Sequence, residues 1–180
     1  FEHFYRMMGT TTAEQLDLRH LDPAYRVFSE PDDGGDSNEN SSDAVRAPLT
    51  IPLGAAEVLD VFEATEPGSR AALSDYLASA VHTHQMAERY FLYNPFTRLR
   101  SLMNRQIVMS MPTLARLLLT PLDRFVARRF RHPVLRQILG YPAVFLGTSP
   151  SAAPAMYHLM SALDLHEGVQ YPMGGFTALV

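Results

Sequence analysis

The chain has 180 residues, of which 47% are hydrophobic and 19% are charged, so a single domain with an apolar core is expected over residues 1–180. It contains no cysteine, which excludes disulfide bonds, cysteine-based zinc or iron–sulfur sites and a thiol nucleophile. The formal net charge of −4 conceals an uneven distribution: residues 1–66 hold fourteen of the nineteen acids, whereas residues 98–136 hold nine Arg and one acid. The two parts would therefore attract different partners.

Targeting signals are missing from the sequence. No run of about 18 apolar residues occurs, so no membrane-spanning helix is predicted. The first residues lack the basic and apolar regions of a signal peptide, and they do not begin with Met. We therefore expect a segment of a longer chain.

The first predicted elements are two strands joined by a long loop. Tyr25, Val27 and Phe28 predict a strand within 21–30. The intervening residues 31–46 are rich in acids, Gly and Ser, which predicts a flexible acidic loop. Residues 47–53 predict a return strand, which two prolines confine to the edge of a sheet.

Helices dominate the remaining chain. The apolar side chains of Val58, Val61 and Phe62 share one face of a predicted helix over 54–64. A long helix is expected to follow, with Ser69 as its N-cap. Further helices are predicted over 94–108, over 111–130 with a division at Pro121, over 132–147 and over 149–165.

The end of the chain combines a short strand with a glycine turn. Residues 168–172 predict the strand, and one more helix is expected from Gly175 onward. Together these elements predict a helix-rich α+β fold with a small antiparallel sheet.

Most motifs of catalytic or metal sites are missing. His84 and Glu88 have a spacing that allows a shared metal, but a third ligand is missing, so a structural or solvated role is expected for the histidines. There is no nucleophile elbow, no P-loop and no dinucleotide-binding glycine motif.

The arginine-rich region over 98–131 alternates basic and large apolar residues. This pattern is typical of a surface helix with a solvated Arg face, which local physics favours, and it also fits a basic amphipathic helix that lies in an anionic bilayer interface. A nucleic-acid partner is not expected, because the motifs are missing and the net charge is negative.

The stretch 171–175, Tyr-Pro-Met-Gly-Gly, is the sharpest local feature. Two adjacent glycines permit positive φ angles, or a close backbone approach to a flat ligand. A strand-to-helix turn also requires glycine, so local physics leaves both interpretations open.

The order of motifs along the chain supplies a further argument. "LDPAYRVF" (21–28) is followed by "EPGSRAALSDYL", by "NPF" and by residues 132–180, which contain P-x-LRQ, G-x-SP, Y-x-LM and GV-x-YP-x-GG-x-x-ALV. This series resembles the central part of the bacterial-type phytoene desaturases, which are flavin-dependent carotenoid desaturases.

The resemblance implies the substrate-binding domain of an amine-oxidase-like fold, with the FAD-binding Rossmann part outside these residues. A long isoprenoid would lie in a tunnel beside the flavin of FAD, which accepts a hydride. The resemblance further implies a cytoplasmic protein, and such a substrate partitions into bilayers, which favours peripheral membrane contact through 98–131.

The matching motif positions imply the site residues. Gly174 and Gly175 would approach the cofactor, and the substrate would contact Phe145, Gly147, Tyr157, Tyr171, Pro172 and Met173. No catalytic residue is assigned, and no metal ligand is expected.

Some positions depart from the family pattern. Gln170 stands where an aromatic residue is common, and Arg100-Ser101 occupy the neighbourhood of a candidate acid. The exact substrate therefore stays open, including that of a related oxidase, isomerase or ketolase. Two other functions also stay open: a non-catalytic module for lipid, isoprenoid or membrane-surface binding, and a helical protein-interaction domain.

Overall fold

The computed structural model describes residues 2–29, 48–88 and 105–179, and the acidic loop predicted over 31–46 falls outside them. The predicted helix over 94–108 and the basic region are described only from residue 105 onward.

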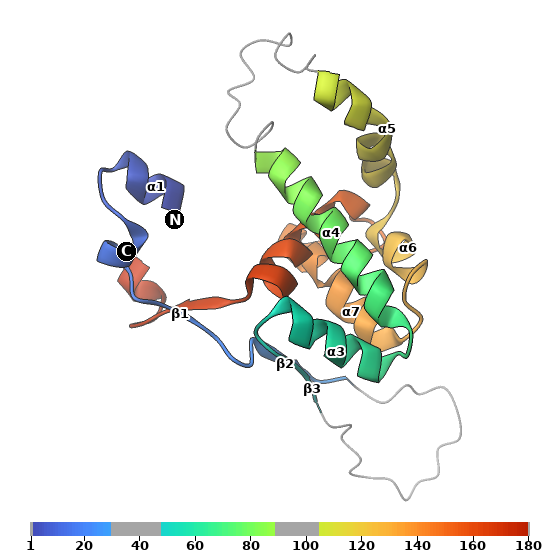
Figure 1. The fold of residues 1–180 in the computed structure, drawn as a ribbon, viewed down its shortest axis with the longest axis horizontal. Coiled ribbons are helices and arrows are strands. Elements are labelled where there is room, and N and C mark those ends of the chain that lie inside the picture. Colours follow the sequence, from blue (N-terminus) through green and yellow to red (C-terminus); the bar gives the residue numbers. More distant parts are fainter. Residues whose placement is uncertain (1, 30–47, 89–104, 180) are drawn as a thin grey trace, which may run out of the picture.

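A body of packed helices makes up most of the structure (Figure 1). Its helices are α3 (Ala55–Thr65), α4 (Ser69–Ala87), α5 (Arg105–Leu119), α6 (Leu122–Ala127) and α7 (Pro133–Gly140). Helix α4 packs against α3 and against the C-terminal helical turns, and α6 packs against α7. The predicted apolar faces explain this packing, because Val58, Phe62, Leu73 and Leu77 are all buried.

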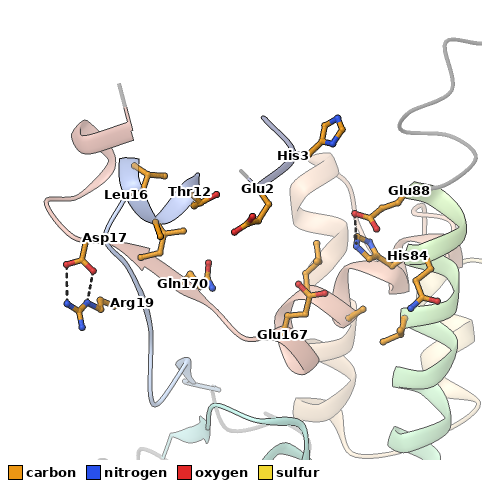
Figure 2. Close-up of a pocket in the computed structure, with 16 residues that line it drawn as sticks. Glu2, His3, Thr12, Leu16, Asp17, Arg19, His84, Glu88, Glu167 and Gln170 are labelled. Carbon is orange, nitrogen blue, oxygen red and sulfur yellow. Dashed lines mark hydrogen bonds and ion pairs between the residues drawn. The ribbon is translucent and has the colours of Figure 1, made fainter. Parts of the chain in front are cut away.

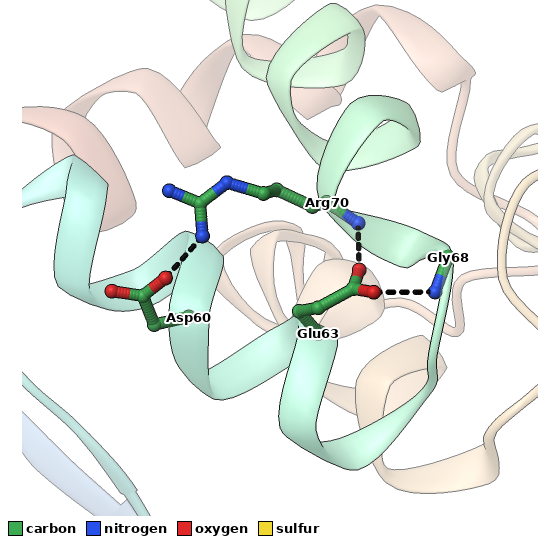
Figure 3. A network of polar contacts seen from close by, with 4 residues as sticks. All are labelled: Asp60, Glu63, Gly68 and Arg70. Atoms are coloured by element: carbon green, nitrogen blue, oxygen red, sulfur yellow. Dashed lines mark hydrogen bonds and ion pairs between the residues drawn. The ribbon is translucent and has the colours of Figure 1, made fainter.

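The start of α4 differs from the prediction by one residue. The N-cap is Gly68, in the left-handed region at φ 88°, and Ser69 is the first helical residue. The carboxylate of Glu63, on α3, accepts hydrogen bonds from the backbone N–H groups of Gly68 and Arg70, both at 2.8 Å (Figure 3). A cap supplied by the preceding helix makes a capping side chain at the terminus unnecessary.

Helix α5 crosses a boundary that the sequence predicts. A new helix is expected at 111, but α5 continues through Pro112. Because a proline has no backbone N–H, α5 lacks one of its internal hydrogen bonds at Pro112, but the helix does not end there. The division expected at Pro121 is confirmed, because α5 ends at Leu119 and Pro121 is the N-cap of α6.

The segment after α7 is built of tight helical turns. The two helical pieces predicted over 132–147 are α7 and the 3₁₀ helix η3 (Tyr141–Leu146). The helix expected from residue 149 begins later, as the 3₁₀ helix η4 (Ala155–Leu159), and leads into the π-helix η5 (Ala162–Glu167).

In the described part of the chain, four short strands form two separate antiparallel pairs in place of one small sheet. The predicted pair is confirmed: β2 (Tyr25–Val27) pairs with β3 (Leu49–Ile51). The predicted C-terminal strand, β4 (Gln170–Pro172), pairs with β1 (Leu18–His20). Strand β1 was not predicted, since Arg19 and His20 give it no β-type apolar pattern.

The pair β1–β4 projects from the helical body (Figure 1). The short helices α1 (Glu2–Met7) and α2 (Thr12–Gln15) lie at its far end, as does the terminal 3₁₀ helix η6 (Phe176–Leu179). Thr11 caps α2 and forms a capping box with Glu14.

An aromatic cluster forms the centre of the body. The ring of Tyr76 lies 6.1 Å from that of Phe130 and 5.5 Å from that of His158, and Phe130 lies 6.0 Å from Phe62. All four side chains are completely buried. Edge-to-face contacts of this kind add to the free energy of apolar burial and connect α3, α4 and η4.

None of the helices within the described ranges combines the length and the apolar content needed to cross a bilayer.

Candidate functional site

The glycine turn adopts positive φ angles, one of the two possibilities that the sequence leaves open. Gly174 has φ 91° and Gly175 has φ 77°, which ordinary residues rarely adopt. Two hydrogen bonds hold the turn, from Met173 N to Asp17 O at 2.8 Å and from Gly175 N to Pro172 O at 3.0 Å. A Cβ at Gly175 would lie 3.5 Å from the Tyr171 hydroxyl, which is an ordinary van der Waals contact. The positive φ angle, and not a lack of space for a side chain, is therefore the reason for a glycine at position 175.

The residues before the turn expose an apolar surface. Tyr171 is 41% exposed and Met173 is 53% exposed, whereas Pro172 between them is buried. Gln170 is exposed as well, so the surface on this side of β4 is interrupted only by Pro172. The predicted residues 171–175 thus form one continuous feature with two outward apolar side chains.

The other predicted substrate residues belong to the helical body. Phe145, on η3, is 67% exposed, and its ring packs edge-to-face with Tyr141 at 5.6 Å. Gly147 ends η3 in the left-handed region, and Tyr157 is half-buried on η4. Figure 1 shows the end of β4 beside β1, away from α7, which leads into η3. A common tunnel for all these residues stays a prediction.

An apolar groove of about 550 Å³ lies between β2 and α7. Most of its lining is apolar or aromatic, with Arg26, Gln137 and Asp164 as polar members. The lining residues are Ala24, Tyr25, Arg26, Val27, Phe28, Gln137, Ile138, Tyr141, Asp164 and Val169. Grooves of this size, with a few polar groups in apolar walls, are typical of sites for small organic ligands.

The polar centre of the groove is a hydrogen bond between Tyr25 and Asp164. The Tyr25 hydroxyl donates to Asp164 Oδ2 at 2.9 Å, across 139 residues of sequence. Burial raises the pKa of Asp164, and the hydrogen bond from Tyr25 opposes that shift. Burial also raises the pKa of Tyr25, with a further contribution from the charge of Asp164. A carboxyl group with a raised pKa in an apolar groove is a marker of functional sites.

Asp164 also lies in the π-helix η5, and π-helical turns occur frequently at functional sites. Sequence patterns indicated no role for Asp164, and they indicated only a strand position for Tyr25. The available signal was a single acid between apolar residues of a predicted helix, because an acid in such a place requires a partner.

A second, wider pocket of about 1000 Å³ separates the N-terminal segment from α4 and η5 (Figure 2). Its lining is mostly polar and includes the Asp17–Arg19 ion pair on one side and His84 and Glu88 on the other. His84 Nε2 lies 3.6 Å from Glu88 Oε1. Within the described ranges, no three His, Cys, Asp or Glu side chains lie close enough together to hold a metal ion.

Comparison with known proteins finds carotenoid desaturases. The chain is 33% identical to a carotenoid 3,4-desaturase of Haloarcula japonica, over 100% of this chain and 33% of the relative. It is 21% identical to 4,4'-diapophytoene desaturases (4,4'-diaponeurosporene-forming) of Staphylococcus aureus strains RF122 and MRSA252, over 99% of this chain and 32% of each relative. No model of a known protein family matches the sequence.

These similarities extend over the whole chain and agree with the resemblance that the order of motifs indicates. By these comparisons the chain is similar to a segment of carotenoid desaturases. It spans about a third of the length of the curated relatives that it matches.

Proposed function

We propose that residues 1–180 are the substrate-binding domain of an FAD-dependent, phytoene desaturase-like oxidoreductase with an amine-oxidase-like fold. The observation that carries the proposal is the similarity to desaturases over the whole chain. The substrate would be a long apolar isoprenoid of carotenoid biosynthesis. FAD, when bound, would accept the hydride that the substrate loses.

The glycine turn is the part of this chain that fits a contact with the flavin. Gly174 and Gly175 present backbone without side chains, so a flat ring system could approach it closely. The exposed side chains of Tyr171 and Met173 beside the turn would then contact the apolar substrate. The remaining FAD contacts would come from other parts of the full protein.

Phe145, Gly147 and Tyr157 are proposed to contact a more distant part of the same chain-like substrate. A long isoprenoid can extend over several elements, and the exposed ring of Phe145 offers apolar surface to it. Recognition of a hydrocarbon rests on the shape and length of such a surface.

The end of α5 supports the proposed peripheral contact with the cytoplasmic membrane. Leu118 is 49% exposed and Leu119 is 85% exposed, beside the exposed Arg116. Binding to an anionic bilayer surface combines two contributions: apolar side chains enter the bilayer interface, and basic side chains are attracted to the anionic headgroups. In a flotation assay with vesicles containing phosphatidylserine, the Leu118→Ser/Leu119→Ser variant should bind less than wild type, and equal binding would contradict this contact.

The main test uses the full-length protein. Purified enzyme should carry flavin absorbance at 1:1 stoichiometry and convert a carotenoid precursor into a product with more conjugated double bonds, seen as a red-shifted absorption spectrum. The Gly174→Val variant should lose most turnover while its expression stays normal, because a β-branched residue resists φ 91°.

The matched control is Gly9→Val, since Gly9 also has a positive φ of 78° and a Cβ there would contact nothing within 4 Å. Wild-type turnover in Gly174→Val would contradict the proposed role of the turn. Binding of isoprenoids and vesicles without flavin in the full-length protein would instead favour a non-catalytic lipid-binding module.

A further inference from the structure

We infer that the groove between β2 and α7 binds the end of an isoprenoid chain that carries a hydroxyl group, and that Tyr25 and Asp164 recognise this group. The inference rests on the proposed function for the isoprenoid nature of the ligand. The inference goes beyond the proposed function by naming a subsite, its residues and the end group that the subsite selects.

The walls of the groove explain the apolar part of the ligand. Val27 and Phe28 on the strand side face Ile138 on α7, and Val169 also lines the groove. Phe28 is 70% exposed, which leaves a large apolar surface for contact. A volume of about 550 Å³ accommodates several isoprene units, and burial of their methyl and methylene groups would favour binding.

The arrangement of the Tyr25–Asp164 pair explains the polar part of the ligand. Tyr25 is the hydrogen-bond partner of Asp164 Oδ2, and no partner of Oδ1 is found within the described ranges. Asp164 lines the groove, so an apolar chain end placed against it would cover a polar oxygen without a partner. Covering such an oxygen is unfavourable, which makes the groove a poor site for a pure hydrocarbon end.

A hydroxyl group satisfies this site in either protonation state of the carboxyl. It donates to an ionised Asp164, and it accepts a hydrogen bond from a protonated Asp164. When the ligand hydroxyl accepts from a protonated Asp164, its own proton can go to the Tyr25 oxygen, which retains lone pairs after donating to Asp164. The Arg26 side chain and the Tyr141 hydroxyl also belong to the groove and contribute to its polarity.

The test compares two probes that differ by one oxygen: farnesol and the same C15 triene with a terminal methyl group in place of the alcohol. Their dissociation constants are measured with the full-length holoenzyme by displacement of an apolar fluorescent dye. Wild type should bind farnesol roughly tenfold more tightly, as expected for one additional hydrogen bond to a polar group in an apolar site.

Three variants assign this preference to the pair. Asp164→Leu should bring the two dissociation constants within about twofold of each other. Tyr25→Phe should keep a preference for farnesol, because Asp164 then lacks its protein partner and still offers an acceptor to the hydroxyl group. Asp164→Asn should keep most of the preference, because an amide both donates and accepts. His166→Gln is the matched control, since His166 is exposed on the same π-helix and does not line the groove, and it should behave as wild type.

The hydrocarbon probe also reports on folding. If a variant keeps its affinity for the hydrocarbon, the apolar walls are intact, and a lost preference for farnesol reflects the missing polar group. Equal affinities of wild type for both probes would overturn the inference, and so would a tenfold preference that persists in Asp164→Leu. Neither result depends on desaturation, which the proposed function tests separately through the absorption spectrum of the product.

Discussion

His158 should make the folded protein sensitive to acid. The imidazole is completely buried, Nδ1 lies 2.8 Å from Ala155 O, and Nε2 lies 3.0 Å from Ser79 Oγ. A carbonyl oxygen only accepts, so Nδ1 carries the proton and Nε2 accepts from the Ser79 hydroxyl in the neutral ring. The neutral form is therefore fully hydrogen-bonded, whereas a second proton would introduce a buried charge.

The direction of the pH effect follows from the pKa of His158, which burial lowers below its ordinary value of 6.5. The unfolded chain then binds a proton at a higher pH than the folded chain does. The contribution of the neutral His158 to the free energy of unfolding is fully present above pH 6.5. This contribution declines as the pH falls from 6.5 toward the folded-state pKa of His158. Each pH unit within that window costs up to about 1.4 kcal/mol, so the loss between pH 6.5 and 5.0 is at most about 2 kcal/mol.

The measurement is urea unfolding followed by circular dichroism between pH 5.0 and 7.5. His158→Gln should remove this part of the pH dependence, because its amide can donate to Ala155 O and accept from Ser79 without titrating. His166→Gln removes an exposed histidine from the neighbouring π-helix and should leave the dependence unchanged. If wild type and His158→Gln lost the same free energy of unfolding on acidification, the assignment to His158 would be wrong.

Two further predictions concern the folded body. Phe130→Ala empties the space between Phe62 and Tyr76 and should reduce the free energy of unfolding by about 3–5 kcal/mol in urea titrations, and a loss below about 1 kcal/mol would show that the aromatic cluster is not the centre of the core. Glu66→Gln weakens an acceptor that receives backbone hydrogen bonds at the start of α7, from Arg131 at 3.0 Å and from His132 at 2.9 Å. It should cost about 1 kcal/mol, and amide exchange at the start of α7 should accelerate, whereas unchanged exchange would contradict a role of Glu66 in holding the residues that lead into α7.

Local sequence patterns predicted those elements whose residues determine their own conformation. The apolar face of α3 and the β-type residues of β2 specify a helix and a strand through periodicity and side-chain shape. The two glycines at 174 and 175 permitted a turn with positive φ, because a residue without Cβ adopts it without steric cost. Pro121 likewise marked the end of α5.

Contacts between distant residues decided the rest. Strand β1 exists because β4 supplies its hydrogen-bond partners from 150 residues away, and no local β preference announces it. The Glu63 carboxylate replaced Ser69 as the cap of α4 only because α3 folds back beside it. The pairing of Tyr25 with Asp164 depends in the same way on the packing of β2 against η5, which gives a lone acid its partner and an apolar groove its polar centre. Periodicity describes one element at a time, whereas the burial of a polar group depends on which elements meet around it.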